Sequence, residues 1–282
     1  MVTLNHSNKM SKNIILSSLK ESFSVIWKKK LLFLLIFFIQ ILFFSALFYI
    51  SLVYQTKIYE STKAISDYMQ QQKLDDITVA KNIINQKNIL GDDPLSISRN
   101  FNNLIINFRL YLIYTFIALI VSMPLLWAMT EKFFSHISLK YFFNNLIIVF
   151  GYLILIFIFF YSLTNISFSG AAQTFGFALK YLIFLILSVV LFYFMYISLS
   201  LARNTELKDI ITKTLKIGIK KMHYILAVYF INFILVVLSV FLLIYFVDTN
   251  FAVVVMAILM FMFSIIFGRI FMLSVVNKLE NL

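Results

Sequence analysis

One stretch constrains this chain more than any other. Three lysines, Lys28 to Lys30, are followed by 24 residues without a charged side chain, residues 31–54. At about 1.5 Å of rise per residue, a helix of that length spans about 36 Å and crosses a hydrocarbon core of about 30 Å. Lysine is costly to move across a membrane, so the three lysines mark the side that stays in the cytoplasm. The sequence therefore predicts a transmembrane helix over residues 31–54.

Composition places the whole chain in the same class. Of its 282 residues, 62% are hydrophobic and 13% are charged, whereas soluble domains carry about 25% charged residues. In a soluble protein the net charge of +12 would suggest nucleic acid, but here the positive charges cluster beside apolar runs. We therefore expect an integral membrane protein that binds no nucleic acid. The chain has no cysteine, which excludes disulfides and thiolate metal sites.

Five further apolar runs follow, each long enough for a membrane helix. We expect these spans at residues 110–129, 146–163, 181–201, 224–247 and 251–272. Residues 55–109 form the one long polar segment, and we expect them to make an extracytoplasmic helical cap. Apolar positions at helical spacing predict that the first span continues outward as a helix, and that another helix leads into the second span.

Two basic helices precede spans. From Lys12 to Trp27, apolar residues recur every fourth position, with serines and charges on the opposite face; residues 1–11 are polar and are expected to lack structure. Residues 206–222 repeat the pattern with a stripe that includes Leu207, Ile211, Leu215 and Ile219. Both patterns predict amphipathic helices at the membrane surface. Residues 1–30 thus form a cytoplasmic tail and an interfacial helix.

The distribution of charge sets the orientation. Residues 1–30 hold six lysines and one glutamate, and residues 203–223 carry a net charge of +4, whereas the expected outer segments are neutral or acidic. We therefore predict an all-α polytopic protein of the cell membrane. It has six transmembrane helices in three hairpins, cytoplasmic interfacial amphipathic helices, and both termini in the cytoplasm.

The layout resembles that of six-span prokaryotic and archaeal integral membrane proteins of uncharacterised function. It is also loosely similar to the membrane domain that accompanies some glycerophosphoryl diester phosphodiesterases. The residues that carry this resemblance are Lys28-Lys29-Lys30 and a Leu-Lys pair in each helix before an outward span, namely Leu19-Lys20, Leu139-Lys140 and Leu207-Lys208. No part of the chain resembles the catalytic barrel of that enzyme family, so the resemblance implies no activity.

The sequence contains no pattern typical of a catalytic or metal site. The three histidines, His6, His136 and His223, are scattered and have no metal-ligand spacing. The oxygens of the acid pairs Asp75-Asp76 and Asp92-Asp93 could bind a divalent cation, but helix capping and a turn explain these pairs more simply. We therefore expect a protein that is not an enzyme and that holds no cofactor and no metal.

Polar side chains within the spans are few. Gln40 and Asn232 lie near mid-span, where each is expected to make an intramembrane contact worth about 1 kcal/mol. Arg109, Lys180 and Arg269 are near the expected span ends, where long side chains reach the headgroups. Because no Asp, Glu or His lies in a span core, a proton-driven mechanism is disfavoured.

The basic helices give the most positive functional signal. Seven lysines are predicted to contact anionic lipid: Lys28, Lys29, Lys30, Lys213, Lys216, Lys220 and Lys221. The leading hypothesis is a non-catalytic membrane protein that organises lipids or partner proteins, with the bilayer, anionic lipid, a membrane protein or a second copy as partner. A passive or partner-driven permease, with Gln40 and Asn232 facing a cavity, is the alternative. A lipid-modifying enzyme, in which His136 or His223 meets Glu131 or Glu206, is a third.

Overall fold

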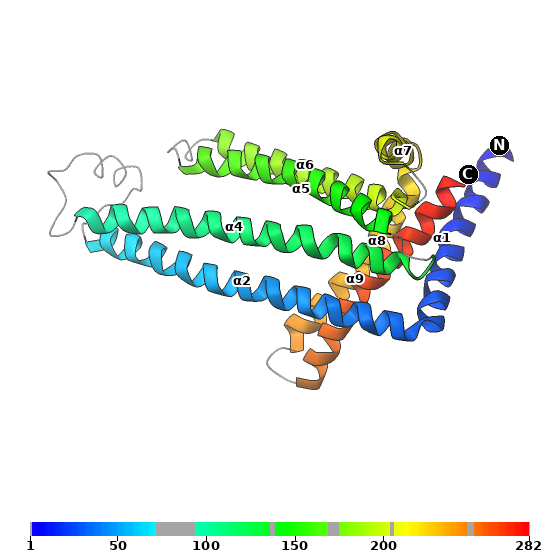
Figure 1. Cartoon of the computed structure of the whole chain (residues 1–282), viewed down its shortest axis with the longest axis horizontal. Coiled ribbons are helices and arrows are strands. Elements are labelled where there is room, and N and C mark those ends of the chain that lie inside the picture. Colours follow the sequence, from blue (N-terminus) through cyan, green and yellow to red (C-terminus); the bar gives the residue numbers. More distant parts are fainter. Residues whose placement is uncertain are drawn as a thin grey trace. The chain divides into compact units, whose positions relative to one another are not determined.

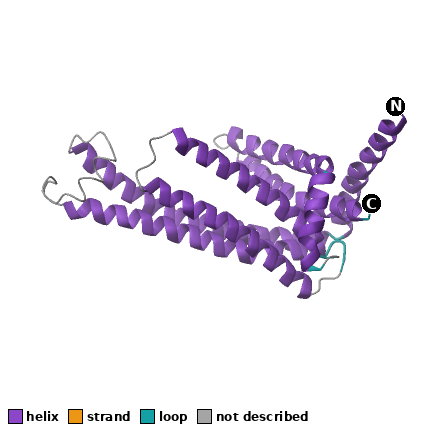
Figure 2. Ribbon diagram, turned by 90° about the horizontal axis from the view of Figure 1, so that it is seen from above, coloured by secondary structure: helices purple, strands orange, loops and turns teal. Residues whose placement is uncertain are grey.

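The computed structural model describes residues 2–71, 94–135, 139–168, 175–203, 206–246 and 251–281. These residues form helices and contain no strand (Figure 1, Figure 2). Long apolar runs become helices because only a helix satisfies its own backbone hydrogen bonds in a lipid environment. The bounds are α1 Val2–Lys28, α2 Lys30–Gln71, α4 Pro94–Glu131, α5 Leu139–Phe168, α6 Phe175–Leu201, α7 Leu207–Lys220, α8 Met222–Phe246 and α9 Phe251–Glu280.

Six of these helices are long and apolar enough to cross a membrane, which confirms the number of spans and the all-helical class. Within the described residues the candidate spans are Lys30–Tyr68, Ile97–Glu131, Leu139–Tyr161, Leu182–Leu201, Met222–Phe246 and Phe251–Glu280. The first two are longer than predicted because the polar ends of α2 and α4 stay helical, as the spacing of apolar residues had indicated. The pairs Asp75-Asp76 and Asp92-Asp93 lie outside the described residues.

The chain divides into two compact units, and the first contains Met1–Leu42, Ile120–Phe159 and Leu182–Leu282. Its centre is the carboxyl-terminal half of α9, which packs against α1 and α8. The side chains buried there include Ile266, Phe267, Ile270, Phe271, Leu273 and Val275. Trp127 of α4 and Met195 of α6 are also buried.

Helix α1 corrects the expectation for residues 1–11. It begins at Val2, so residues 2–11 are helical where we expected no structure; they contain no Pro or Gly to interrupt a helix. Two serines of α1 also lie in a packed contact, because Ser18 and Ser22 are fully buried. Trp27 is 73% exposed, whereas Phe23, which is 49% exposed, packs its ring on Phe267 of α9 with ring centroids 4.8 Å apart. Small side chains allow helices in a membrane bundle to approach closely, so serine is favoured at the contact.

The second unit contains Phe43–Leu119 and Phe160–Tyr181. Aromatic pairs hold its helices together: Tyr54 of α2 stacks on Tyr114 of α4 with ring centroids 5.6 Å apart, and Phe108 stacks on Phe160 at 6.2 Å. The guanidinium of Arg109 lies 5.8 Å from the centre of the Tyr161 ring, and Arg109 is exposed. The side chain of Lys180 lies outside the described residues.

Candidate functional site

The three consecutive lysines lie at a bend, which we call the first elbow (residues 28–30). Helix α1 ends at Lys28 and α2 begins at Lys30, and Figure 1 shows the chain turning sharply between them. Backbone hydrogen bonds continue on both sides of the bend, from Lys29 N to Val25 O at 3.0 Å and from Phe33 N to Lys29 O at 3.1 Å. The bend is therefore an ordered part of the fold that presents three positive charges together.

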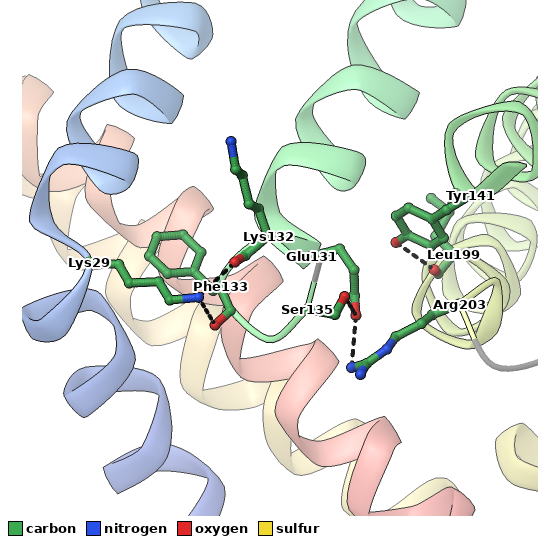
Figure 3. Close-up of polar contacts among 8 residues, drawn as sticks. All are labelled: Lys29, Glu131, Lys132, Phe133, Ser135, Tyr141, Leu199 and Arg203. Carbon is green, nitrogen blue, oxygen red and sulfur yellow. Dashed lines mark hydrogen bonds and ion pairs between the residues drawn. The ribbon is translucent and has the colours of Figure 1, made fainter. Parts of the chain in front are cut away.

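The middle lysine of the first elbow binds the end of another helix. Lys29 Nζ donates to the main-chain oxygens of Lys132 and Phe133, each at 2.9 Å (Figure 3). These carbonyls directly follow the last residue of α4, where a helix has unsatisfied acceptors and a partial negative charge. The Lys29 ammonium is thus engaged by the protein itself, although we had grouped it with the lipid-facing lysines.

Beside this contact lies a pocket of about 480 Å³, which we call the elbow pocket. Its lining residues are Trp27, Lys28, Lys29, Lys30, Leu31, Leu32 and Lys132. The Lys30 ammonium lies 4.2 Å from the centre of the Trp27 ring, in the geometry of a cation–π contact. None of the lining residues is acidic. Lys132, which the sequence analysis did not select, joins this pocket only because α4 ends next to the elbow.

A second elbow (residues 220–222) repeats the arrangement. Helix α7 ends at Lys220 and α8 begins at Met222. Between them Lys221 donates from Nζ to the main-chain oxygen of Leu279, at 2.6 Å, near the end of α9. Burial lowers the pKa of the Lys221 ammonium, and the charge of Lys216 lowers that pKa further. Lys221, like Lys29, is therefore hydrogen-bonded to main-chain oxygen at the end of another helix.

The remaining lysines of α7 have different roles. Lys213 pairs with Glu280 at 2.7 Å, whereas Lys216 and Lys220 are exposed. The packed face of α7 contains Gly218, where an added Cβ would stand 2.7 Å from the ring of Phe194, so α7 approaches α6 closely. Another face exposes apolar side chains, namely Leu207, Ile211, Leu215 and Ile219, with Ile211 and Ile219 each 66% exposed. Two lysines thus bind α9, and two face outward beside an apolar stripe.

A partly buried ion pair joins α4 to Arg203, two residues after the end of α6. Glu131 is 1% exposed, and its Oε1 lies 3.1 Å from Arg203 Nη1. Ser135 Oγ donates to the same oxygen at 3.4 Å, and Tyr141 lies nearby with its hydroxyl donating to Leu199 O at 3.4 Å (Figure 3). Glu131 Oε2 has no hydrogen-bond partner among the described residues. The carboxylate is thus held by a cation in a buried site.

Of the two histidines considered for an enzyme, only His223 lies among the described residues. His136 lies outside the described residues, and His223 is exposed at the start of α8 with its ring against Tyr224. Glu206 pairs with Lys208 at 3.0 Å. Among the described residues, no group of three or more His, Cys, Asp or Glu side chains is arranged to hold a metal ion.

The intramembrane polar residues both contact α9. Gln40 is fully buried; its Nε2 donates to Met262 O at 3.2 Å, and its Oε1 accepts a hydrogen bond from Arg269 Nη2. Arg269 is 7% exposed, so the expectation that it reaches the headgroups was wrong. The side-chain amide of Asn232 lies against Gly268, where an added Cβ would be 2.9 Å from Nδ2. Gln40 and Asn232 therefore pack on adjacent residues of one helix.

In comparisons with protein-family models, curated proteins and solved structures, the chain matches none of them. The function is therefore inferred from the geometry of the two elbows and from the residues around them.

Proposed function

We propose that this chain is a non-catalytic integral membrane protein that organises anionic lipid in the inner leaflet, with both elbows on the cytoplasmic side. The observation that carries the proposal is the division of α7 into three faces. One face packs on the bundle, the next exposes Ile211, Leu215 and Ile219, and the third presents Lys216 and Lys220. A helix with this pattern is suited to lie in the membrane surface, with its apolar stripe towards the acyl chains.

The exposed isoleucines and lysines of α7 are each stabilised by a different part of a lipid. Apolar side chains gain about 25 cal/mol for each Å² that they remove from water, so the stripe favours contact with hydrocarbon. Lysines beside anionic headgroups gain up to about 1 kcal/mol each. Both in-plane helices connect to the end of α9, because Lys278 pairs with Glu21 of α1 and Glu280 pairs with Lys213 of α7. The two basic helices therefore act on the same leaflet.

Native mass spectrometry of protein released from nanodiscs tests this proposal. The discs contain equal amounts of phosphatidylcholine and phosphatidylglycerol, and we expect the wild type to retain phosphatidylglycerol preferentially. The double substitution Lys216→Gln with Lys220→Gln should weaken this preference by about fivefold for each lysine. The control variant, Lys57→Gln with Lys63→Gln, removes the same number of charges from exposed lysines of a different helix, α2. It should leave the preference for phosphatidylglycerol unchanged. Equal retention of both lipids by the wild type would contradict the proposal, and a stoichiometric protein subunit would point to a partner-organising role instead.

A further inference from the structure

The lining of the elbow pocket combines two chemical kinds of side chain. Lys28, Lys30 and Lys132 are basic, and Leu31 and Leu32, in the first turn of α2, are apolar. Leu31 is 84% exposed and Trp27 is 73% exposed, so the pocket is open to its surroundings. A lipid combines the same two kinds of group, since a phosphate headgroup is attached to acyl chains. The basic residues suit the headgroup, and the leucines suit the start of a chain.

The positive charge of the lining residues indicates that the pocket binds an anion. Lys29 is occupied by the carbonyls at the end of α4, and in Figure 3 the Lys132 side chain points away from that contact. The ammonium groups of Lys28, Lys30 and Lys132 form no hydrogen bond or ion pair with any other residue that the structure describes. Three like charges around one pocket repel each other, and a bound anion relieves that repulsion.

Size and charge together select the class of ligand. A pocket of about 480 Å³ is in the range that accommodates a whole small-molecule group, of about 300–1,000 Å³, so a single phosphate would leave most of it empty. Three ammonium groups also exceed what one singly charged phosphodiester neutralises. A headgroup with two phosphodiesters fits both the pocket volume and the number of ammonium groups better than a single phosphate does. Basic pockets near the ends of membrane helices bind headgroups of this kind.

We propose that the elbow pocket binds a lipid with two phosphates, of the diphosphatidylglycerol type. Its phosphates contact Lys28, Lys30 and Lys132, and an acyl chain starts along Leu31 and Leu32. The inference rests on the proposed function and deepens it by naming the lipid class and the pocket. Lys29 acts there as a positioning residue, because it holds the end of α4, and with it Lys132, against the elbow.

The test uses nanodiscs of phosphatidylcholine that contain phosphatidylglycerol and diphosphatidylglycerol at equal total phosphate. Native mass spectrometry of the full-length wild type should show one diphosphatidylglycerol retained in preference to phosphatidylglycerol. Lys28→Gln with Lys132→Gln should reduce that preference by about thirtyfold, which corresponds to about 2 kcal/mol at 1.4 kcal/mol for each factor of ten. Lys28→Arg with Lys132→Arg keeps the charge and should keep the binding, which separates loss of charge from a failure to fold. Lys216→Gln with Lys220→Gln should leave this particular preference intact.

The outcomes distinguish the two proposals. Retention of both anionic lipids without preference would overturn the two-phosphate site and leave the lipid-organising function standing. Preference that survives Lys28→Gln with Lys132→Gln would also overturn the site, since the lipid would then bind elsewhere. Inorganic pyrophosphate serves as the soluble probe; if it binds the wild type as tightly as the lipid does, the pocket's ligand is a free anion and the lipid assignment is wrong. Failure to retain any anionic lipid would overturn both proposals.

Discussion

Lys29 and Lys221 make the same kind of contact at two separate elbows. Each follows another lysine, each lies between a basic helix and an apolar span, and each donates from Nζ to main-chain oxygens at the end of a different span. For Lys29 the acceptors follow α4, and for Lys221 the acceptor is near the end of α9. In each Lys-Lys pair, one ammonium is thus bonded to a helix end, although Lys29 is itself exposed, whereas its neighbour, Lys28 or Lys220, makes no such bond with the described residues.

This relationship predicts that the two lysines of each pair differ in their effect on stability. Lys29→Met removes a charged donor from two carbonyls and should lower the free energy of unfolding by about 1.5–3 kcal/mol. Lys221→Met should cost less, because burial already disfavours the ammonium there and lowers its pKa. Unfolding in detergent with increasing denaturant measures both. Lys28→Met and Lys220→Met are the matched controls; an equal loss of stability in those variants would refute a specific role for the capping lysines.

The buried carboxylate of Glu131 predicts an asymmetric pair of substitutions. Arg203→Met leaves the buried Glu131 carboxyl without its cation, so Glu131 must either stay as an unpaired charge or take up a proton, and the loss of the pair should destabilise the protein by about 3 kcal/mol. Adding Glu131→Gln removes the stranded charge and should recover part of that loss, as a double-mutant cycle would measure. If the double variant is as unstable as the sum of the two single variants, the two side chains do not interact in the way that their 3.1 Å separation indicates.

The packing of α1 predicts different responses at two nearby serines. Ser22 is fully buried, whereas Ser24 is exposed. Ser22→Leu inserts a large side chain into a close helix contact and should cost about 1–3 kcal/mol. Ser24→Leu should be nearly neutral. Thermal unfolding of both variants checks this prediction; the opposite order would contradict the packing of Ser22 in the contact of α1.

Orientation is testable because the chain has no native cysteine. Ser24→Cys on α1 and Thr212→Cys on α7 place single thiols at exposed positions next to the two elbows. We expect an impermeant maleimide to label both only from the cytoplasmic side, and to label Ser66→Cys on the outer part of α2 only from outside. Labelling of positions 24 and 212 from opposite sides would contradict the assignment of both elbows to one leaflet.

The number of spans and their approximate positions were predictable because an apolar run of about 20 residues is a local signal. The contact face of α1 was not predictable in this way. Hydrophobic periodicity identifies the side of a helix that avoids water, but at a membrane the lipid provides an apolar environment as well as the protein core does. Trp27 is therefore exposed, Phe23 packs on Phe267, and Ser18 and Ser22 are buried. The apolar stripe alone did not show which side of α1 contacts the bundle.

The candidate site was predictable only as a list of lysines. Position along the chain does not show which ammonium meets a helix end, so Lys29 and Lys28 appeared equivalent. Lys132 joins the elbow pocket through a contact between segments about 100 residues apart, and no local pattern marks such a contact. Arg269 was misjudged because α9 continues through Glu280, eleven residues and about 16 Å further, which keeps its side chain inside the bundle.

The contact between Gln40 and Arg269 gives the final prediction. Gln40→Leu removes the amide oxygen that accepts from a buried guanidinium, so the charge is left without that acceptor. Arg269→Met removes the charge itself and leaves the Gln40 amide donating to Met262 O. An unsatisfied buried charge costs more than an unsatisfied neutral group, so Gln40→Leu should destabilise the protein more than Arg269→Met does. Denaturant unfolding in lipid-detergent micelles measures the difference, with Gln40→Glu as a further variant that should be tolerated only while Arg269 is present. A larger loss in Arg269→Met than in Gln40→Leu would mean that the guanidinium is stabilised by other groups and that Gln40 is not its main acceptor.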